Sequence, residues 1–106
     1  MKHIEHDIQV GIVKYLRMMG VFCFAVPNGG NRDAKTGAFL KNEGALAGVA
    51  DLIIVMPNKV FFVEIKTDNG KQSESQQHFQ NEVIKRGHNY YIWRSVGDAV
   101  KFHEMF

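Results

Sequence analysis

The sequence is poor in cysteine and has no long apolar segment. Its 106 residues include one cysteine, which excludes an intramolecular disulfide and a zinc site built from several cysteines. No apolar run approaches the roughly 18 residues that a membrane-spanning helix requires. The polar start, MKHIEHD, does not resemble a secretory signal peptide. We therefore expect an intracellular, cytoplasmic protein with no membrane segment.

The composition is that of one folded domain. Hydrophobic residues make up 45% of the chain and aromatic residues 11%, enough for a modest core. The length, with no repeat, low-complexity tract or linker, predicts a single domain over residues 1–106. The net charge of +2 permits a polyanionic partner but does not by itself indicate one.

Apolar periodicity predicts an alternation of helices and strands. A continuous apolar run predicts a central strand over residues 21–26, where Cys23 is expected to be a buried hydrophobic residue rather than a nucleophile. The predicted elements, in order, are a helix over 3–19, strands over 21–26, 52–56 and 60–63, a helix from Ser73 to Gly87, a strand over 90–93 and a helix from Ser95. This order predicts an α/β fold in which helices flank a mixed sheet.

Residues 27–48 form the only long segment without a clear pattern, apart from a short strand considered at 38–40. The segment carries five glycines and three basic residues, Arg32, Lys35 and Lys41. Loops of this length in compact domains are usually functional or disordered. The segment is either a solvated loop or a glycine-jointed flap whose amides and cations contact phosphates.

Three charged residues interrupt the two strands of a predicted hairpin over residues 48–66. Asp51 opens the first strand, and Glu64 and Lys66 lie two residues apart at the end of the second. A two-residue turn at 57–58 would set Asp51 opposite Glu64, and one at 58–59 would set it opposite Lys66. Both registers put the three side chains on one face, whereas a three-residue link without a bulge would move Asp51 to the other face.

Two facing carboxylates repel each other, and a divalent cation between them removes the repulsion. Carboxylate oxygens suit Mg²⁺ or Mn²⁺, and the backbone carbonyl of Ile65 could add a further oxygen. Lys66 could orient an attacking water or stabilise charge on a phosphate, so the set suits metal-assisted phosphodiester hydrolysis. The alternative is a surface ion pair of little energetic value. Polar breaks in buried strands favour the functional interpretation.

Two further residues have two possible roles each. Glu5 could complement the dipole of the first helix, or it could add a carboxylate to the metal site if that helix packs over this edge. Gln76 lies three residues after Ser73, so it could complete a capping box or contact the site.

The spacing of the charged residues resembles a known nuclease signature. Asp51, followed after twelve residues by Glu64-Ile65-Lys66, resembles the PD-(D/E)XK motif and is more closely similar to its VRR-NUC branch. The elements that match, in order, are Glu5 and Gln9, Pro27-Asn28-Gly29, Gly48-Val49-Ala50-Asp51-Leu52, Glu64-Ile65-Lys66, and Gly70-Lys71-Gln72-Ser73-Glu74-Ser75-Gln76. Ala50 stands where the family has proline, which would only stiffen the chain before the strand.

The resemblance implies a restriction-endonuclease-like fold and roles for particular residues. Asp51, Glu64 and the Ile65 carbonyl would bind Mg²⁺ or Mn²⁺, with Glu5 binding it directly or through water. Lys66 would be the catalytic lysine, and Gln76 would contact the site. The residues expected to contact DNA are Asn28, Arg32, Lys35, Lys41 and Lys71.

The resemblance also implies a substrate and an assembly. Short stand-alone members, typically of viruses and bacteria, resemble four-way (Holliday) junction resolvases and are expected to act as homodimers. We therefore expect a homodimeric endonuclease on branched DNA in a bacterium or a phage-infected host. The alternatives are a nickase or restriction-like enzyme on linear duplex DNA, and a catalytically silent nucleic-acid-binding module.

Overall fold

A computed structural model of the chain describes residues 4–27 and 34–106, with side chains from Thr36 onward in the second range. The elements are α1 (Ile4–Met18), β1 (Phe22–Ala25), α2 (Ala34–Asn42), β2 (Leu52–Met56), β3 (Lys59–Ile65), α3 (Glu74–Lys85), β4 (Asn89–Trp93) and α4 (Val96–Glu104). None of these described helices is both long and apolar enough to cross a membrane.

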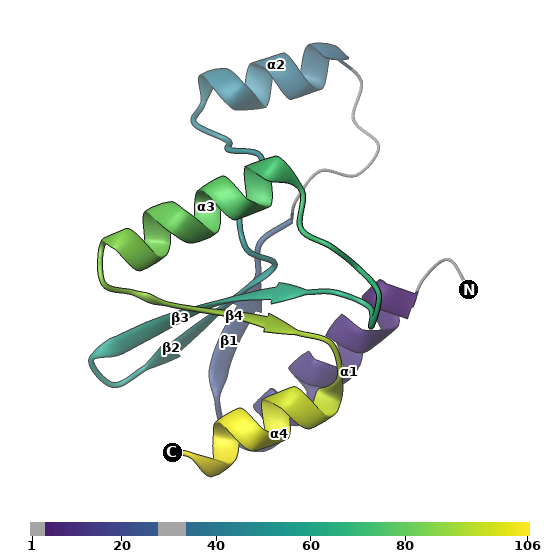
Figure 1. Cartoon of the computed structure of the whole chain (residues 1–106), viewed down its shortest axis with the longest axis vertical. Coiled ribbons are helices and arrows are strands. Elements are labelled where there is room, and N and C mark those ends of the chain that lie inside the picture. Colours follow the sequence, from purple (N-terminus) through teal and green to yellow (C-terminus); the bar gives the residue numbers. More distant parts are fainter. Residues whose placement is uncertain (1–3, 28–33) are drawn as a thin grey trace.

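The four strands form one mixed sheet in the order β1-β2-β3-β4. The pairs β1–β2 and β2–β3 are antiparallel, and β3–β4 is parallel. Because parallel neighbours need a crossover, α3 connects β3 to β4. Figure 1 shows α3 on one face of the sheet and α1 with α4 on the other. The predicted α/β fold, a mixed sheet flanked by helices, is confirmed.

Alternating residues of β3 serve the two faces of the sheet. Phe61, Val63 and Ile65 are buried in the core that α1 and α4 complete. On the opposite face, the Phe62 ring packs edge-on against Phe79 of α3, with centroids 5.8 Å apart. Glu64 follows two residues after Phe62, so its carboxylate lies under α3 rather than in the apolar core.

The β2–β3 hairpin has a two-residue turn at Pro57 and Asn58. Met56 pairs with Lys59, and Asn58 has a φ of 64°, the left-handed conformation that a turn after proline often needs. Leu52 pairs with Val63, so the register, continued by one residue, sets Asp51 opposite Glu64. This is the first of the two registers considered, and the three-residue link is excluded.

Two expectations about residues 21–48 were wrong. Residues 38–40 lie in α2 and not in a strand. The sequence did not indicate this helix because none of its described side chains is buried, so it carries no clear apolar periodicity. β1 is an edge strand and not a central one. Phe22 and Phe24 are 66% and 42% exposed, so this continuous apolar run is buried on one face only.

Candidate active site

Asp51 lies one residue before β2. It accepts hydrogen bonds from β3 on one side and from the residue that follows β1 on the other. Its Oδ2 accepts a hydrogen bond from the backbone N–H of Ile65 at 2.7 Å. Its own carbonyl accepts one from the N–H of Val26 at 2.8 Å. The carboxylate therefore has a fixed place at the end of the sheet, beside the last residue of β3.

Glu64 is a buried charge with one satisfied and one unsatisfied oxygen. The residue is 1% exposed, and its Oε1 accepts hydrogen bonds from Gln72 Nε2 at 3.0 Å and from the Tyr90 hydroxyl at 2.5 Å. Oε2 receives no hydrogen bond, although Lys66 Nζ lies 3.5 Å away. That contact is an attraction between charges without hydrogen-bond geometry. Buried charges are costly unless they are well paired, so this oxygen, which has no hydrogen-bond donor, makes Glu64 a candidate site residue.

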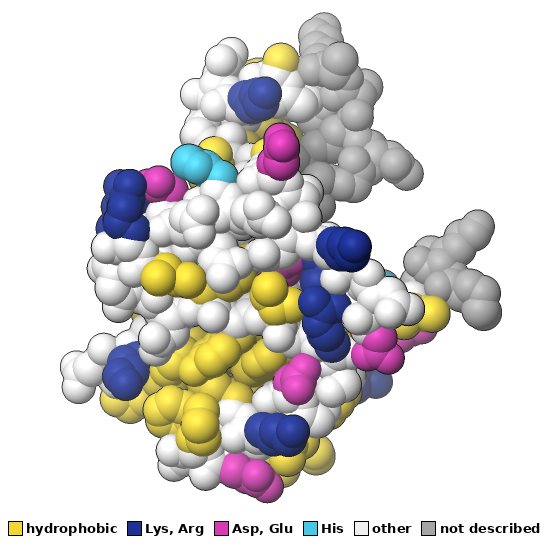
Figure 2. Space-filling model, in the orientation of Figure 1, with side chains coloured by type: hydrophobic (Ala, Val, Ile, Leu, Met, Phe, Trp, Pro, Cys, Tyr) yellow, Lys and Arg dark blue, Asp and Glu magenta, His cyan; other side chains and the backbone are white. Residues whose placement is uncertain are grey.

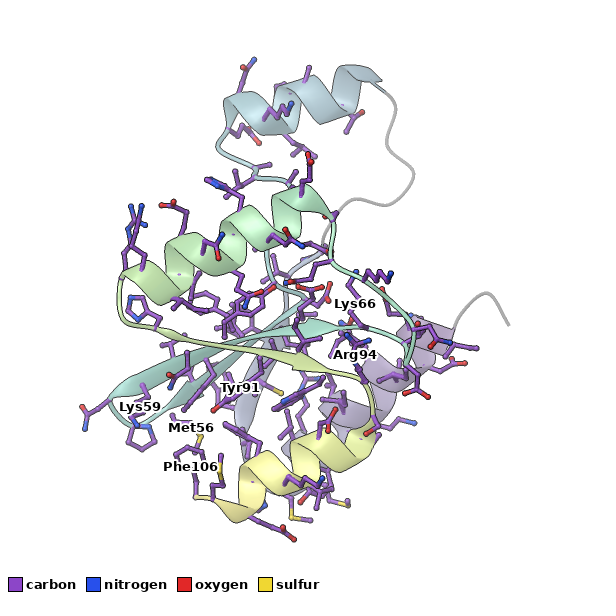
Figure 3. All side chains as sticks on the ribbon, viewed as in Figure 1. Met56, Lys59, Lys66, Tyr91, Arg94 and Phe106 are labelled. Atoms are coloured by element: carbon purple, nitrogen blue, oxygen red, sulfur yellow. The ribbon has the colours of Figure 1, made fainter. Side chains whose placement is uncertain are left out.

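Lys66 follows the end of β3 and points along the same face as Glu64. Its backbone N–H donates to the Trp93 carbonyl at 2.9 Å, which continues the β3–β4 ladder by one residue. Its side chain is 12% exposed, so the ammonium is largely shielded from water. Figure 3 shows Lys66 and Arg94 close together at this end of the sheet.

Glu5 approaches the same group from the first turn of α1. Partial burial raises the pKa of its carboxyl, the Lys66 ammonium opposes this effect, and the charges of Asp51 and Glu64 raise the pKa further. Within the described residues, no three His, Cys, Asp or Glu side chains are close enough to share a metal ion. Whether Glu5 contacts a metal directly or through water therefore stays a prediction.

Gln76 completes a capping box at the start of α3, as predicted. Its Oε1 accepts from the Ser73 N–H at 2.8 Å, and the Ser73 hydroxyl accepts from the Gln76 N–H at 3.2 Å. Gln76 also lines a cavity with Glu5 and Asp51. The cap is thus present in the structure, and a direct role in the site stays a prediction.

That cavity has a volume of about 670 Å³ and separates the acidic residues from α2 and the loop that follows it. Lys41 lines it as a cation, together with the acidic residues Glu5 and Asp51. Figure 1 shows α2 beyond α3, on the side away from the sheet. The loop reaches the start of α3 at Gly48, whose φ is 85° and whose added Cβ would overlap the Ser75 backbone.

The other residues predicted to contact DNA are only partly described. Lys71 is exposed beside the start of α3, so a phosphate could reach it. Asn28 and Arg32 lie outside the described residues, as does the side chain of Lys35. Figure 2 shows Lys and Arg side chains in separate small groups across the visible face rather than in one continuous patch.

Two residues that donate hydrogen bonds to Glu64, and Gln80, which binds one of them, were not predicted from the sequence. Gln72 donates to both Glu64 and Gln80, at 3.0 and 2.6 Å, and the Tyr90 hydroxyl donates to Glu64. Burial raises the pKa of Tyr90 well above its usual value, as do its hydrogen bond to Glu64 and the nearby carboxylates. The available signal was that a buried tyrosine hydroxyl usually finds a partner.

The residues present fit a divalent cation. Asp51 and Glu64 supply carboxylate oxygens, which Mg²⁺ and Mn²⁺ prefer, and the Ile65 carbonyl lies between Glu64 and Lys66 in the chain. With Glu5, three carboxylates face one ammonium, so the site has an excess of negative charge. The buried Oε2 of Glu64, which has no hydrogen-bond donor, is the oxygen that a cation would satisfy.

A mixed sheet with this acid–acid–lysine set at one end has a nuclease-type fold. The chain belongs to the VRR-NUC domain family, whose model matches residues 29–97. Among curated proteins, no sequence matches the chain.

Two solved structures share the fold. One, described as "VRR_NUC domain", is 22% identical with a TM-score of 0.71, over 97% of this chain and 97% of that chain. The other, described as "VRR_NUC domain protein", is 16% identical with a TM-score of 0.75, over 96% of this chain and 86% of that chain. At this identity, the likeness is one of fold.

Proposed function

We propose that the protein is a divalent-metal-dependent endonuclease that hydrolyses phosphodiester bonds in branched DNA. The observation that carries this proposal is the buried Glu64 carboxylate. Its Oε2 has no hydrogen-bond donor, lies 3.5 Å from Lys66 Nζ, and belongs to a residue that the strand register sets opposite Asp51. A structural ion pair would not need a second carboxylate at the same point.

Each residue of the set has a chemical task in this proposal. Asp51, Glu64 and the Ile65 carbonyl would hold Mg²⁺ or Mn²⁺, which polarises a phosphoryl oxygen and acidifies a bound water. The Lys66 ammonium is shielded from solvent, so its charge acts strongly on a phosphate or an attacking water beside it. Glu5 would accept a hydrogen bond from water bound at the site.

The cavity beside Asp51 suits a DNA backbone. A volume of about 670 Å³ accommodates a nucleotide, and Lys41 at its wall can neutralise a phosphate. Lys71 would extend this path past the start of α3. Asn28, Arg32 and Lys35 remain predicted DNA contacts.

The proposed substrate requires two copies of the chain. A four-way junction has two-fold symmetry, and two symmetric nicks need two active sites in a C₂ arrangement. The described residues contain one acid–acid–lysine set, so a homodimer supplies the second. This step concerns assembly, and the proposed hydrolysis does not depend on it.

The experiment compares a labelled four-way junction with a linear duplex of the same sequence, in Mg²⁺ and in excess chelator. We expect paired nicks in the junction alone, at a salt concentration that weakens non-specific phosphate binding. We also expect a mass in solution of twice the 12.1 kDa of the chain. Equal cutting of both substrates would favour a nickase on linear DNA. Binding without any cutting would favour a silent nucleic-acid-binding module.

A further inference from the structure

The Oε1 atom of Glu64 is held by a network that spans three parts of the chain. Tyr90 comes from β4, Gln72 from the loop before α3, and Gln80 from α3 itself. Tyr90 and Gln72 both donate to Oε1, and Gln72 also donates to Gln80 Oε1 at 2.6 Å. The network thus ties the buried carboxylate to the helix above it and to the neighbouring strand.

The chemistry of the partners fixes the direction of each hydrogen bond. An ionised carboxylate only accepts, so the Tyr90 hydroxyl and the Gln72 amide must both donate. Gln72 Nε2 has two hydrogens, and both are used: one on Glu64 Oε1 and one on Gln80 Oε1. The Gln72 amide therefore cannot rotate without losing both bonds, and Gln80 sets its orientation.

The two oxygens of Glu64 are consequently unequal. Oε1 has two neutral donors, whereas Oε2 has no hydrogen bond and faces the Lys66 ammonium. A neutral donor pair on one oxygen orients the carboxylate without cancelling its charge. Oε2, the oxygen without a hydrogen bond, is therefore the one that faces the charged Lys66 side chain.

We propose that Tyr90, Gln72 and Gln80 are positioning residues that reserve Glu64 Oε2 as a single-oxygen ligand for the divalent cation. This inference rests on the proposed function, since it assumes that Glu64 binds a metal. Partners of this kind around metal ligands typically change metal affinity or activity by about 10- to 100-fold when they are removed. They act by orienting the ligand, so their loss should weaken metal binding before it affects the chemical step.

The test removes one donor at a time. Tyr90→Phe deletes only the hydroxyl on Oε1, and Gln72→Met deletes the amide at similar length. The matched controls are Tyr91→Phe, next in the chain but stacked on Phe61 in the opposite face of the sheet, and Gln77→Met, on the exposed side of α3. Thermal unfolding confirms that each variant is folded.

Calorimetric titration with Mn²⁺ is the primary measurement, because it requires no DNA and no turnover. We expect the Mn²⁺ dissociation constant to rise about 10-fold or more in Tyr90→Phe and Gln72→Met, and to stay unchanged in the two controls. In cleavage assays, the Mg²⁺ concentration for half-maximal activity should rise in parallel. The rate at saturating Mg²⁺ and the KM for DNA should stay near those of the wild type.

The two levels of the proposal fail in different ways. If the wild type binds Mn²⁺ and Tyr90→Phe and Gln72→Met bind it equally well, the positioning role is wrong and the proposed nuclease stands. If the rate at saturating metal falls and the Mn²⁺ affinity does not, the residues act on the chemistry and the inference is again wrong. If the wild type binds no Mn²⁺, the metal-dependent function and this inference both fall.

Discussion

The carboxylate of Asp51 accepts a hydrogen bond from the backbone N–H of Ile65 at 2.7 Å. β2 begins one residue after Asp51, so its ladder does not reach this N–H, and the side chain takes the place of a strand carbonyl. Asp51 therefore has a structural task, closing the sheet, in addition to the proposed task of binding a cation. The two tasks can be separated by substitution.

Asp51→Ala removes both tasks, whereas Asp51→Asn keeps an oxygen that can accept from Ile65. Leaving the N–H of the buried residue Ile65 unpaired should lower the free energy of unfolding by about 1–3 kcal/mol in Asp51→Ala. Asp51→Asn should lie closer to the wild type in stability. Both variants should lose Mn²⁺ binding, because the charge is gone. Denaturant unfolding and calorimetry measure the two effects, and wild-type Mn²⁺ affinity in Asp51→Asn would refute the ligand role.

Lys66 provides the nearest positive charge to the buried Glu64 carboxylate. Lys66→Met should lower the free energy of unfolding by about 3 kcal/mol, because it leaves a charge buried without its counter-ion. Lys66→Arg keeps the charge and should recover most of this stability. It should not recover cleavage, since a planar guanidinium does not replace a compact ammonium. Unfolding curves and single-turnover cleavage measure both outcomes. Cleavage at the wild-type rate in Lys66→Arg would contradict a specific catalytic role.

The capping box separates two roles for Gln76. Ser73→Ala and Gln76→Ala each remove one of its two reciprocal hydrogen bonds, and each should cost about 1 kcal/mol of stability. Because the Gln76 side-chain oxygen is already bound to the Ser73 N–H, we expect the two variants to cleave DNA at similar rates. The assay is run well below both unfolding temperatures. A much larger loss of rate in Gln76→Ala than in Ser73→Ala would instead support the predicted direct role of Gln76 in the site.

Gly48 is required both by its conformation and by a close approach. Its φ is 85°, and an added Cβ would overlap Ser75 and lie 2.7 Å from the Gln76 nitrogen. Gly87 has a nearly equal φ of 88° with nothing within 4 Å of such a Cβ, so Gly87→Ala measures the backbone cost alone, about 1–2 kcal/mol. Gly48→Ala should be clearly less stable than that. Equal stabilities of the two variants in denaturant would show that the close approach of Gly48 to the start of α3 does not limit the side chain at this position.

Much of the fold could be predicted because the sheet and the helices that pack on it carry strong apolar patterns. The hairpin could be predicted, and either two-residue turn puts Asp51, Glu64 and Lys66 on one face. Which turn forms was left open, and the structure selects the one at Pro57 and Asn58, which sets Asp51 opposite Glu64. α2 could not be predicted, because it buries none of its described side chains. The edge position of β1 was missed for a related reason. A run of apolar residues does not show whether one face of the strand is buried or both are.

The donors on Glu64 could not be predicted for a different reason. Gln72 reaches Glu64 through a loop, and Tyr90 reaches it across the parallel β3–β4 pair. Neither contact follows from spacing along the chain. The register of the parallel β3–β4 pair, which the sequence did not specify, sets Tyr90 opposite Phe62 and so places it on the face of Glu64.

Single-turnover cleavage of a labelled four-way junction over a range of Mg²⁺ concentrations, by the wild type and by Glu64→Gln, tests the central proposal most directly. Glu64→Gln keeps the size of the buried side chain and removes its charge. We predict that wild-type cleavage rises with Mg²⁺ and stops in excess chelator, and that Glu64→Gln is slower by about 100-fold or more. Equal rates for the two proteins, or wild-type cleavage that persists in chelator, would contradict a metal-dependent nuclease site at Asp51, Glu64 and Lys66.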